Sequence, residues 1–88
     1  LFLNKKNWKF STKAIHVGNE ADKESGSVSP PIHLTSTFKQ DGVGKNRGND
    51  YSRVSNPTRT RLEENLAGLD GAKHAICFST GMAATTAL

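Results

Sequence analysis

SNPTRTRLEENLAGLDGAK, residues 55–73, carries the clearest local structural signals in this sequence. Asn56 is a good N-terminal cap, and Pro57 falls on the first helical position, where its missing N–H is not needed. Gly71 is the usual kind of C-terminal stop. Apolar side chains recur at helical spacing between these two ends, at Leu62, Leu66 and Leu69. The stretch predicts an amphipathic helix that begins after Asn56, ends at Gly71 and turns its charged residues mostly to the other face.

Residues 74–79, HAICFS, form a short apolar run directly after this predicted helix. Such a run is typical of a buried strand in an α/β unit. Residues 80–88, TGMAATTAL, then change to small residues that tolerate a helix, so the predicted order is helix, strand, tight glycine turn and helix. Cys77 lies within the apolar run, which favours a buried and unreactive thiol.

The glycine turn at Gly81 has a possible chemical use. A helix that starts near Met82 leaves several backbone N–H groups unpaired at its N-terminus, and these groups can bind an anion. Gly81 can serve there by taking a backbone conformation closed to other residues, or by letting a bulky anion approach the amides. Ser79 and Thr80 add hydroxyl donors. Because such turns also occur for purely steric reasons, a phosphate site and a structural turn both remain open.

A second candidate site is YSR, residues 51–53. Tyr51 and Arg53 are two residues apart, so on an extended segment both side chains point the same way. Arg53 can hold a phosphate or carboxylate through its two-pronged guanidinium, and Tyr51 can add a hydroxyl donor. The alternative is an ordinary surface pair. A whole predicted helix separates this pair from Gly81, so the pair need not reach the Gly81 of its own subunit.

The chain before residue 51 has weaker signals. Residues 1–30 show no sustained period and read as an extended arm or loop. In residues 32–38, IHLTSTF, one alternating set is Ile32, Leu34 and Ser36, and the other is His33, Thr35 and Thr37. The β-branched residues among them suit an extended or strand-like path. Residues 39–50, KQDGVGKNRGND, predict a surface loop, because their glycine spacing matches neither the dinucleotide fingerprint nor the phosphate-binding loop of nucleotide hydrolases.

Composition limits what these 88 residues can form. One modest domain is the upper bound, and a hydrophobic content of 34% is low for a free-standing globule. The sequence begins at Leu1 and ends in an alanine-rich pattern without a helix stop, so we expect a piece of a larger protein. Cys77 is the only cysteine, which suits a reducing compartment, and we expect a cytoplasmic protein.

Partners are constrained by charge and hydropathy. The net charge of +4 comes largely from one N-terminal segment, in which Phe2, Trp8 and Phe10 interleave with lysines. A solvated arm and a small basic interaction module are both open, and no recognisable nucleic-acid module supports the latter. The stretch 1–10 is basic and free of acids, as transit peptides are, but is too short to decide. The histidines and Cys77 show no metal-ligand spacing, and no run approaches the ~20 apolar residues of a membrane span.

Four stretches together resemble one known family. They are AIHVG (14–18), PPIHLTSTFKQ (30–40), YSRVSNPTR (51–59) and LEENLAGLDGAKHAICFSTGMAA (62–84). From about Thr12 onward the sequence resembles the N-terminal portion of the cysteine/methionine-metabolism family of pyridoxal-phosphate enzymes. The resemblance implies an α/β fold in which residues 1–50 form a subunit-clasping arm. Residues 51–88 would then supply the first helix, strand and helix of the large domain of a fold type I transferase.

The same resemblance implies roles for four residues. The backbone amides of Gly81 and Met82 would hold the phosphate of pyridoxal 5'-phosphate, and Tyr51 and Arg53 would reach that phosphate from the neighbouring subunit. The enzyme would be a homo-oligomer, a tetramer, with sites shared between subunits. Thr80 stands where many relatives have serine, which keeps the hydroxyl.

The resemblance to this family also implies a reaction for the full-length enzyme. The TFKQ run and the glycine-containing loop are most similar to members that cleave cystathionine to cysteine, 2-oxobutanoate and ammonia. Cystathionine gamma-synthases, methionine gamma-lyases and O-acetylhomoserine sulfhydrylases share the core motifs, so these reactions stay open. In the family the lysine bonded to the cofactor lies further along the chain. None of the eight lysines here is assigned that role, no catalytic residue is expected in these 88 residues, and by themselves they are expected to be inactive.

Overall fold

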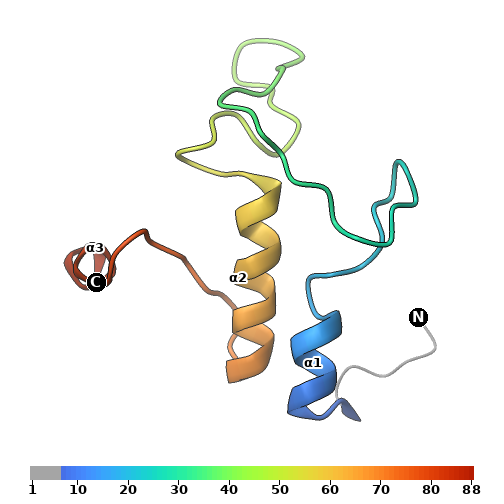
Figure 1. Ribbon diagram of the computed structural model, residues 1–88. Helices are drawn as coiled ribbons and strands as arrows, with labels where there is room; N and C mark the ends of the chain where they lie inside the picture. The colour runs from blue at the N-terminus through green and yellow to red at the C-terminus, as the bar shows by residue number, and fades with distance from the viewer. Residues whose placement is uncertain (1–6) are drawn as a thin grey trace.

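A computed structural model describes residues 7–88 of the chain. Three helices follow one another, α1 (Phe10–His16), α2 (Pro57–Asp70) and α3 (Gly81–Ala87), as Figure 1 shows. The predictions for Phe2 and the first lysines, including a targeting segment, fall on residues 1–6 and lie outside the described residues.

The central helix α2 has the ends that its sequence predicts. The Asn56 side chain accepts a hydrogen bond from the Thr58 backbone N–H, and Pro57 occupies the first turn. Gly71 ends the helix in the left-handed conformation with φ 67°, and its N–H donates to the carbonyl groups of Ala67 and Gly68. Both caps are local interactions that satisfy otherwise unpaired backbone groups, and the helix prediction is confirmed.

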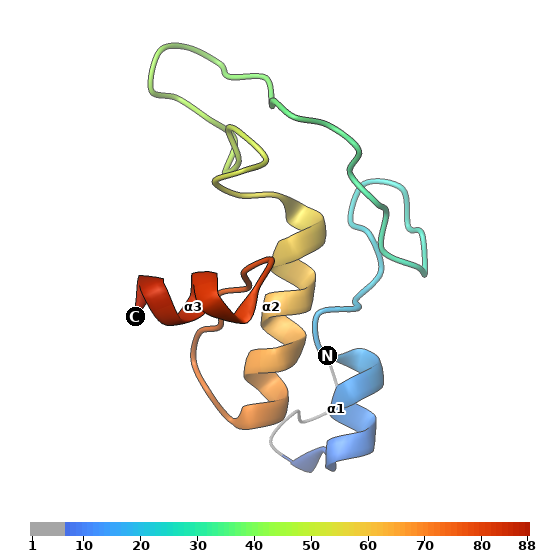
Figure 2. The same cartoon turned by 60° about the vertical axis from the view of Figure 1, so that its left-hand side comes forward.

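Helix α1 lies alongside α2 and runs antiparallel to it, as Figures 1 and 2 both show. Glycines make this close approach possible. A Cβ added at Gly18 would lie 2.4 Å from the Arg61 carbonyl oxygen, and one added at Gly68 would lie 2.8 Å from Cγ1 of Val17. Gly18 and Ala67 are the buried residues of the described chain. The close-packed centre of the structure is therefore the contact between these two helices.

The C-terminal end of α1 is capped by side chains of α2. Asn65 Nδ2 donates to the carbonyl oxygen of Val17 at 2.8 Å and also lies 3.2 Å from those of Lys13 and Ala14. Arg61 Nη1 donates to the carbonyl oxygens of Gly18 at 3.0 Å and Glu20 at 2.8 Å. The expectation of an arm without regular structure over residues 1–30 is thus wrong for residues 10–16, because distant side chains stabilise a short helix there.

The polar side of α2, rather than its leucine side, makes these contacts. Leu62 and Leu66 are 52% and 41% exposed, whereas Arg61 and Asn65 are half-buried. The polar face of α2 is therefore partly covered. The physical reason is that α1 lies against the side of α2 that carries Asn65 and Gly68, where a helix can approach closely.

No strand forms within residues 7–88. Residues 32–38 run extended, but their pairing is limited to an isolated bridge between Thr37 and Tyr51. Hydrogen bonds from Phe38 N to Asp50 O and from Ser52 N to Ser36 O close the base of a loop over residues 39–50, which confirms the loop prediction.

The strand predicted at residues 74–79 is also not formed. This segment is an extended connection in which Ile76 is 74% exposed, Phe78 is 44% exposed and Cys77 is half-buried. The predictions of a buried strand and a buried thiol are therefore wrong for this structure. A strand requires a neighbour for its backbone hydrogen bonds, and the described chain places none beside this segment.

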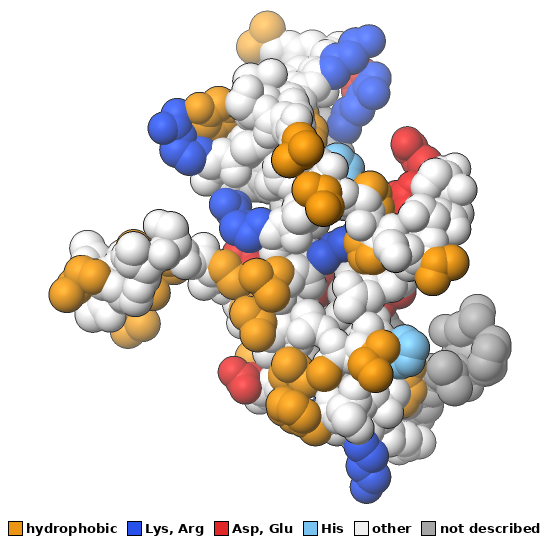
Figure 3. Space-filling model, in the orientation of Figure 1, with side chains coloured by type: hydrophobic (Ala, Val, Ile, Leu, Met, Phe, Trp, Pro, Cys, Tyr) orange, Lys and Arg blue, Asp and Glu red, His pale blue; other side chains and the backbone are white. Residues whose placement is uncertain are grey.

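The described chain is open rather than closely packed. Its radius of gyration is 15.0 Å, against about 12 Å for a compact domain of this length. Helix α3 stands away from α2 at the end of the connection 71–80, as Figure 1 shows. Figure 3 shows apolar side chains exposed over several parts of one face of the molecule.

Candidate functional site

The YSR segment is held in place at the start of α2. Asn56 Nδ2 donates to Ser52 Oγ at 3.0 Å and lies 3.3 Å from the His33 carbonyl oxygen. The Ser52 hydroxyl in turn donates to the carbonyl oxygen of Thr35. One capping residue therefore fixes the start of the helix, the extended segment before the loop, and the serine between Tyr51 and Arg53.

Tyr51 and Arg53 lie together, although not on an extended segment. The N–H groups of Val54 and Ser55 both donate to the Tyr51 carbonyl oxygen at 2.9 Å, so the chain turns here. Arg53 Nη2 donates to the Tyr51 hydroxyl, and the guanidinium carbon lies 4.9 Å from the centroid of the Tyr51 ring. The expected extended geometry is wrong, but the pairing of the phenol with the guanidinium is present. Arg53 remains exposed and has donors left for an anion.

The second candidate segment, Ser79–Met82, opens helix α3 as predicted. Thr80 caps the helix, and its hydroxyl oxygen accepts from Ala83 N at 3.0 Å. Within residues 7–88, the backbone N–H groups of Gly81 and Met82 have no hydrogen-bond partner. They are the unpaired donors that the sequence predicts for this turn.

Of the two uses foreseen for Gly81, the structure contradicts one. Gly81 is not among the glycines with positive φ, so no left-handed conformation requires a glycine there. A Cβ added at Gly81 would meet no atom of the described chain within 4 Å. What remains is the open approach to the free amides, which a side chain would obstruct only for a ligand.

One open hollow of about 840 Å³ lies between the two candidate segments. Its lining brings together Arg53, Arg59 and Ser79. The remaining wall comes from their chain neighbours, Ser52, Val54, Ile76, Cys77 and Phe78. Tyr51, Gly81 and Met82 do not line it. The structure thus places Arg53 near the start of the Ser79–Met82 segment in a single chain, but does not bring all four predicted residues to one point.

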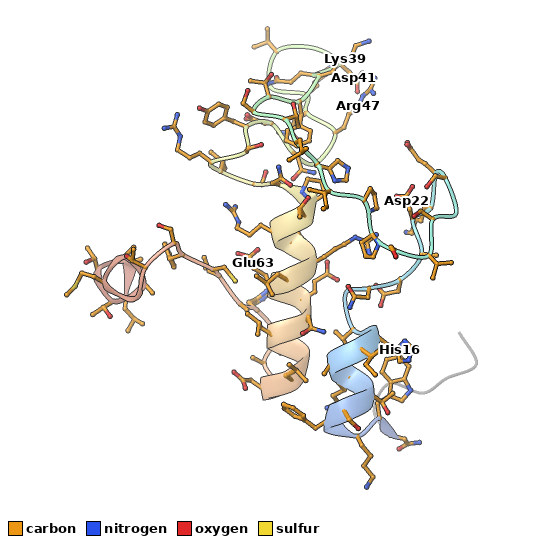
Figure 4. All side chains as sticks on the ribbon, viewed as in Figure 1. His16, Asp22, Lys39, Asp41, Arg47 and Glu63 are labelled. Atoms are coloured by element: carbon orange, nitrogen blue, oxygen red, sulfur yellow. The ribbon has the colours of Figure 1, made fainter. Side chains whose placement is uncertain are left out.

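Two residues that support this hollow were not singled out from the sequence. Arg59 Nη2 donates to the Val54 carbonyl oxygen at 2.6 Å, and Glu63 Oε2 accepts from Cys77 N at 2.8 Å. Figure 4 shows Glu63 on the side of α2 that faces the connection 71–80. The sequence did offer one signal for these residues: Arg59 and Glu63 are four residues apart, a spacing that allows an ion pair on a helix.

Shifted pKa values occur away from the hollow. Side-chain and backbone hydrogen bonds from Ser25 hold the pKa of Asp22 below its usual value. The hydrogen bond to Asp41 raises the pKa of Arg47, whose Nη2 lies 2.8 Å from the Asp41 carboxylate. Asp22 and Arg47 are labelled in Figure 4 on loops distant from Glu63. These interactions stabilise loops and do not tune the candidate site.

Other kinds of site receive no support from the described residues. Residues 7–88 contain no group of three or more His, Cys, Asp or Glu side chains placed to hold a metal ion. In the same part of the chain no helix is long and apolar enough to cross a bilayer. On the face shown in Figure 3, basic side chains are spread out rather than gathered in one patch.

The residues present fit the phosphate end of a cofactor. Two guanidinium groups and the Ser79 hydroxyl line one hollow, and the free amides of Gly81 and Met82 follow in the chain. Arginine forks and helix-terminal amides are the usual ligands of a phosphate. Donors of these types would suit an anionic group such as a phosphate near the Tyr-Arg turn and the glycine turn.

Comparisons with known proteins identify the family. Residues 11–88 match the family described as "Cys/Met metabolism PLP-dependent enzyme". The chain belongs to this family, whose cofactor is pyridoxal phosphate, and the resemblance noted in the sequence is confirmed.

Individual relatives include both lyases and synthases. Bovine (Bos taurus) cystathionine gamma-lyase is 50% identical over 80 residues, which cover 90% of this chain and 20% of the relative. The crystal structure of metB from Corynebacterium glutamicum superposes with a TM-score of 0.88 at 44% identity, covering 96% of this chain and 22% of that one. Cystathionine gamma-synthase from Xanthomonas oryzae pv. oryzae, solved with cystathionine, gives 0.80 at 43% identity, covering 90% and 20%. The chain spans about a fifth of the length of these relatives.

Proposed function

We propose that the full-length protein is a pyridoxal-phosphate-dependent carbon–sulfur lyase. With water as co-reactant, it would cleave cystathionine to cysteine, 2-oxobutanoate and ammonia. The observation that carries this proposal is the 50% identity to a cystathionine gamma-lyase over nine-tenths of the chain. When bound, the cofactor supplies an electron sink for carbanion chemistry at the substrate.

A second candidate reaction is that of a cystathionine gamma-synthase. The similarity to a gamma-synthase solved with cystathionine favours it, because the backbone of this chain superposes well on that enzyme too. Methionine gamma-lyase and O-acetylhomoserine sulfhydrylase activities remain further alternatives. They share the motifs around Tyr51 and Gly81 on which the cofactor part of the proposal depends.

Within this chain we assign four residues to the cofactor phosphate. Gly81 and Met82 would donate their free backbone N–H groups, and Tyr51 and Arg53 would add a hydroxyl and a guanidinium. By resemblance to the family, the Tyr51 and Arg53 of one subunit serve the site of its neighbour in a homotetramer. The single cysteine supports a cytoplasmic location. None of these residues moves a proton of the substrate; their work is to bind and orient.

A substrate panel tests the proposed reaction. Purified full-length protein with pyridoxal phosphate is assayed separately with cystathionine, methionine, and an activated homoserine ester plus cysteine. We expect 2-oxobutanoate and free cysteine from cystathionine at the highest kcat/KM of the panel. Formation of cystathionine from the ester as the fastest reaction would replace the lyase with the synthase, and methionine as the best substrate would identify a methionine lyase.

Replacing Gly81 by alanine tests the amide site. We expect pyridoxal-phosphate affinity of the full-length protein to fall about tenfold, since the new methyl group obstructs the amides. The free energy of unfolding should not fall, because the new Cβ meets no atom of the described chain within 4 Å. Alanine also restricts the unfolded chain more than glycine does, which stabilises the folded protein by roughly 0.4–1 kcal/mol. The measurements are the Kd by fluorescence titration and the Tm of the apoprotein.

Gly71→Ala is the matched control for this variant. Gly71 also has open space around its Cβ position, but its φ of +67° is unfavourable for alanine. This control should lower the Tm and leave the Kd unchanged, which is the opposite pattern. Unaltered cofactor affinity in Gly81→Ala would remove this glycine from the site.

A further inference from the structure

Arg59 and Glu63 form an ion pair one turn apart on α2. Arg59 Nε lies 3.6 Å from Glu63 Oε2, and the two side chains are 34% and 18% exposed. By comparison, the loop pair Arg47–Asp41 is 60% and 54% exposed. Arg59 Nε is buried and has no hydrogen-bond partner in the described chain, so the Glu63 carboxylate is its nearest compensating charge.

Each member of the pair also binds a backbone group outside α2. Arg59 donates to the carbonyl oxygen of Val54, the residue after Arg53, at 2.6 Å. Glu63 accepts from the N–H of Cys77, two residues before Ser79, at 2.8 Å. Both bonds are made to charged groups, which makes them stronger than bonds between neutral groups. The pair therefore joins the Tyr51–Val54 turn and the connection to α3 through one helix.

We propose that Arg59 and Glu63 are positioning residues for the cofactor phosphate. Through their ion pair they fix the Arg53 turn and the Ser79–Met82 segment on the same helix, and so set the place of the donors on each. This inference rests on the proposed function. An ordinary helical ion pair at the surface would contribute little, but this pair is partly enclosed and each partner holds a separate segment of the hollow.

Loss of the Arg59–Glu63 ion pair is expected to weaken binding of the cofactor phosphate and to leave binding of the pyridoxal ring nearly unchanged. Without Glu63 the Cys77 N–H loses its acceptor and Arg59 loses its compensating charge, so both segments can shift by a fraction of an ångström. Misplaced donors weaken a geometry-dependent contact strongly. Affinity for pyridoxal phosphate should fall about tenfold, while affinity for pyridoxal, which lacks the phosphate, should change by less than about twofold.

The experiment uses full-length apoprotein titrated separately with pyridoxal phosphate and pyridoxal. Variants are Glu63→Ala and Arg59→Ala, with Glu63→Gln and Arg59→Lys as milder changes should the alanine forms fail to fold. In Glu63→Gln the amide oxygen still accepts from Cys77, so its loss of phosphate affinity should be smaller than that of Glu63→Ala. Glu64→Gln, a neutralised and exposed neighbour on the same helix, is the control and should leave both affinities unchanged.

The outcomes separate this inference from the proposed function. A loss confined to pyridoxal phosphate in the Glu63 and Arg59 variants supports the positioning role. Equal losses for both ligands, or unchanged affinities, would overturn it, since a merely structural role does not discriminate the phosphate. If the unmodified protein binds pyridoxal phosphate no better than pyridoxal, the phosphate site itself is wrong.

Discussion

Replacing Gly18 by alanine is expected to release α1 from α2. The new Cβ would lie 2.4 Å from the Arg61 carbonyl oxygen, a backbone atom that cannot move independently of α2. Gly18 also has a φ of +79°, which costs a residue with a side chain roughly 1–2 kcal/mol. With about 1–3 kcal/mol for the steric overlap, the docking of α1 should weaken by roughly 2–5 kcal/mol. Amide hydrogen exchange of residues 10–20 in the full-length protein measures this loss.

Gly26→Ala separates the two contributions. Gly26 has nearly the same φ, +74°, but a Cβ there would meet no atom within 4 Å. This variant should show the conformational cost alone, with little effect on exchange in α1. If Gly18→Ala is no more disruptive than Gly26→Ala, the close contact between residue 18 and α2 does not contribute to stability, and α1 does not pack against α2 in this way.

The sequence alone predicts those helix ends that are set by residues within a few positions of them. Asn56 and Gly71 each satisfy backbone groups within a few residues of themselves, so both ends of α2 follow from the residue types. The start of α3 at Thr80 and Gly81 was predictable for the same reason. The motifs at residues 51–53 and 79–82 likewise indicated two segments that lie just before α2 and at the start of α3, and their role in a site stays a prediction.

Helix α1 was not predictable in this way. Its N-cap, Lys9, makes no side-chain capping bond, and the carbonyl groups at its end are satisfied by Asn65, about fifty residues away. The strand expected at residues 74–79 failed for a related reason. Strand formation depends on a neighbouring strand, and no residue pattern within the segment itself can show whether one is present.

The types of donor at the candidate site follow from the sequence, whereas their geometry does not. The types of donor at Arg53 and Gly81 suit a phosphate in either conformation, but the turn at Tyr51 and the ordinary φ of Gly81 depend on context. The spacing of Arg59 and Glu63 on the predicted helix allows an ion pair between them but does not indicate a role at the candidate site. Their bonds to Val54 and Cys77 arise from the tertiary path of the chain.

Arg53→Ala is expected to give the largest loss of cofactor affinity. A guanidinium that binds a phosphate makes charge-assisted hydrogen bonds worth about 1.5–3 kcal/mol, or roughly 10- to 100-fold in Kd. The Kd of Arg53→Lys for the cofactor should lie between those of Arg53→Ala and the unmodified protein, since lysine keeps the charge but lacks the two-pronged guanidinium. Arg47→Ala, an exposed arginine paired with Asp41, is the matched control and should bind the cofactor normally. Unchanged affinity in Arg53→Ala would remove this residue from the site.

Mixed oligomers of Arg53→Ala and Gly81→Val subunits decide which subunit Arg53 serves. If Arg53 reaches the neighbouring site, one site of each hybrid dimer combines an intact Gly81 from one subunit with an intact Arg53 from the other. That site should bind pyridoxal phosphate with the affinity of the unmodified protein, while the second site carries both defects. If Arg53 serves its own chain, as the shared hollow with Ser79 allows, every site carries one defect and no tight-binding fraction forms. A titration of refolded mixtures against each variant alone therefore distinguishes the two arrangements by counting tight sites.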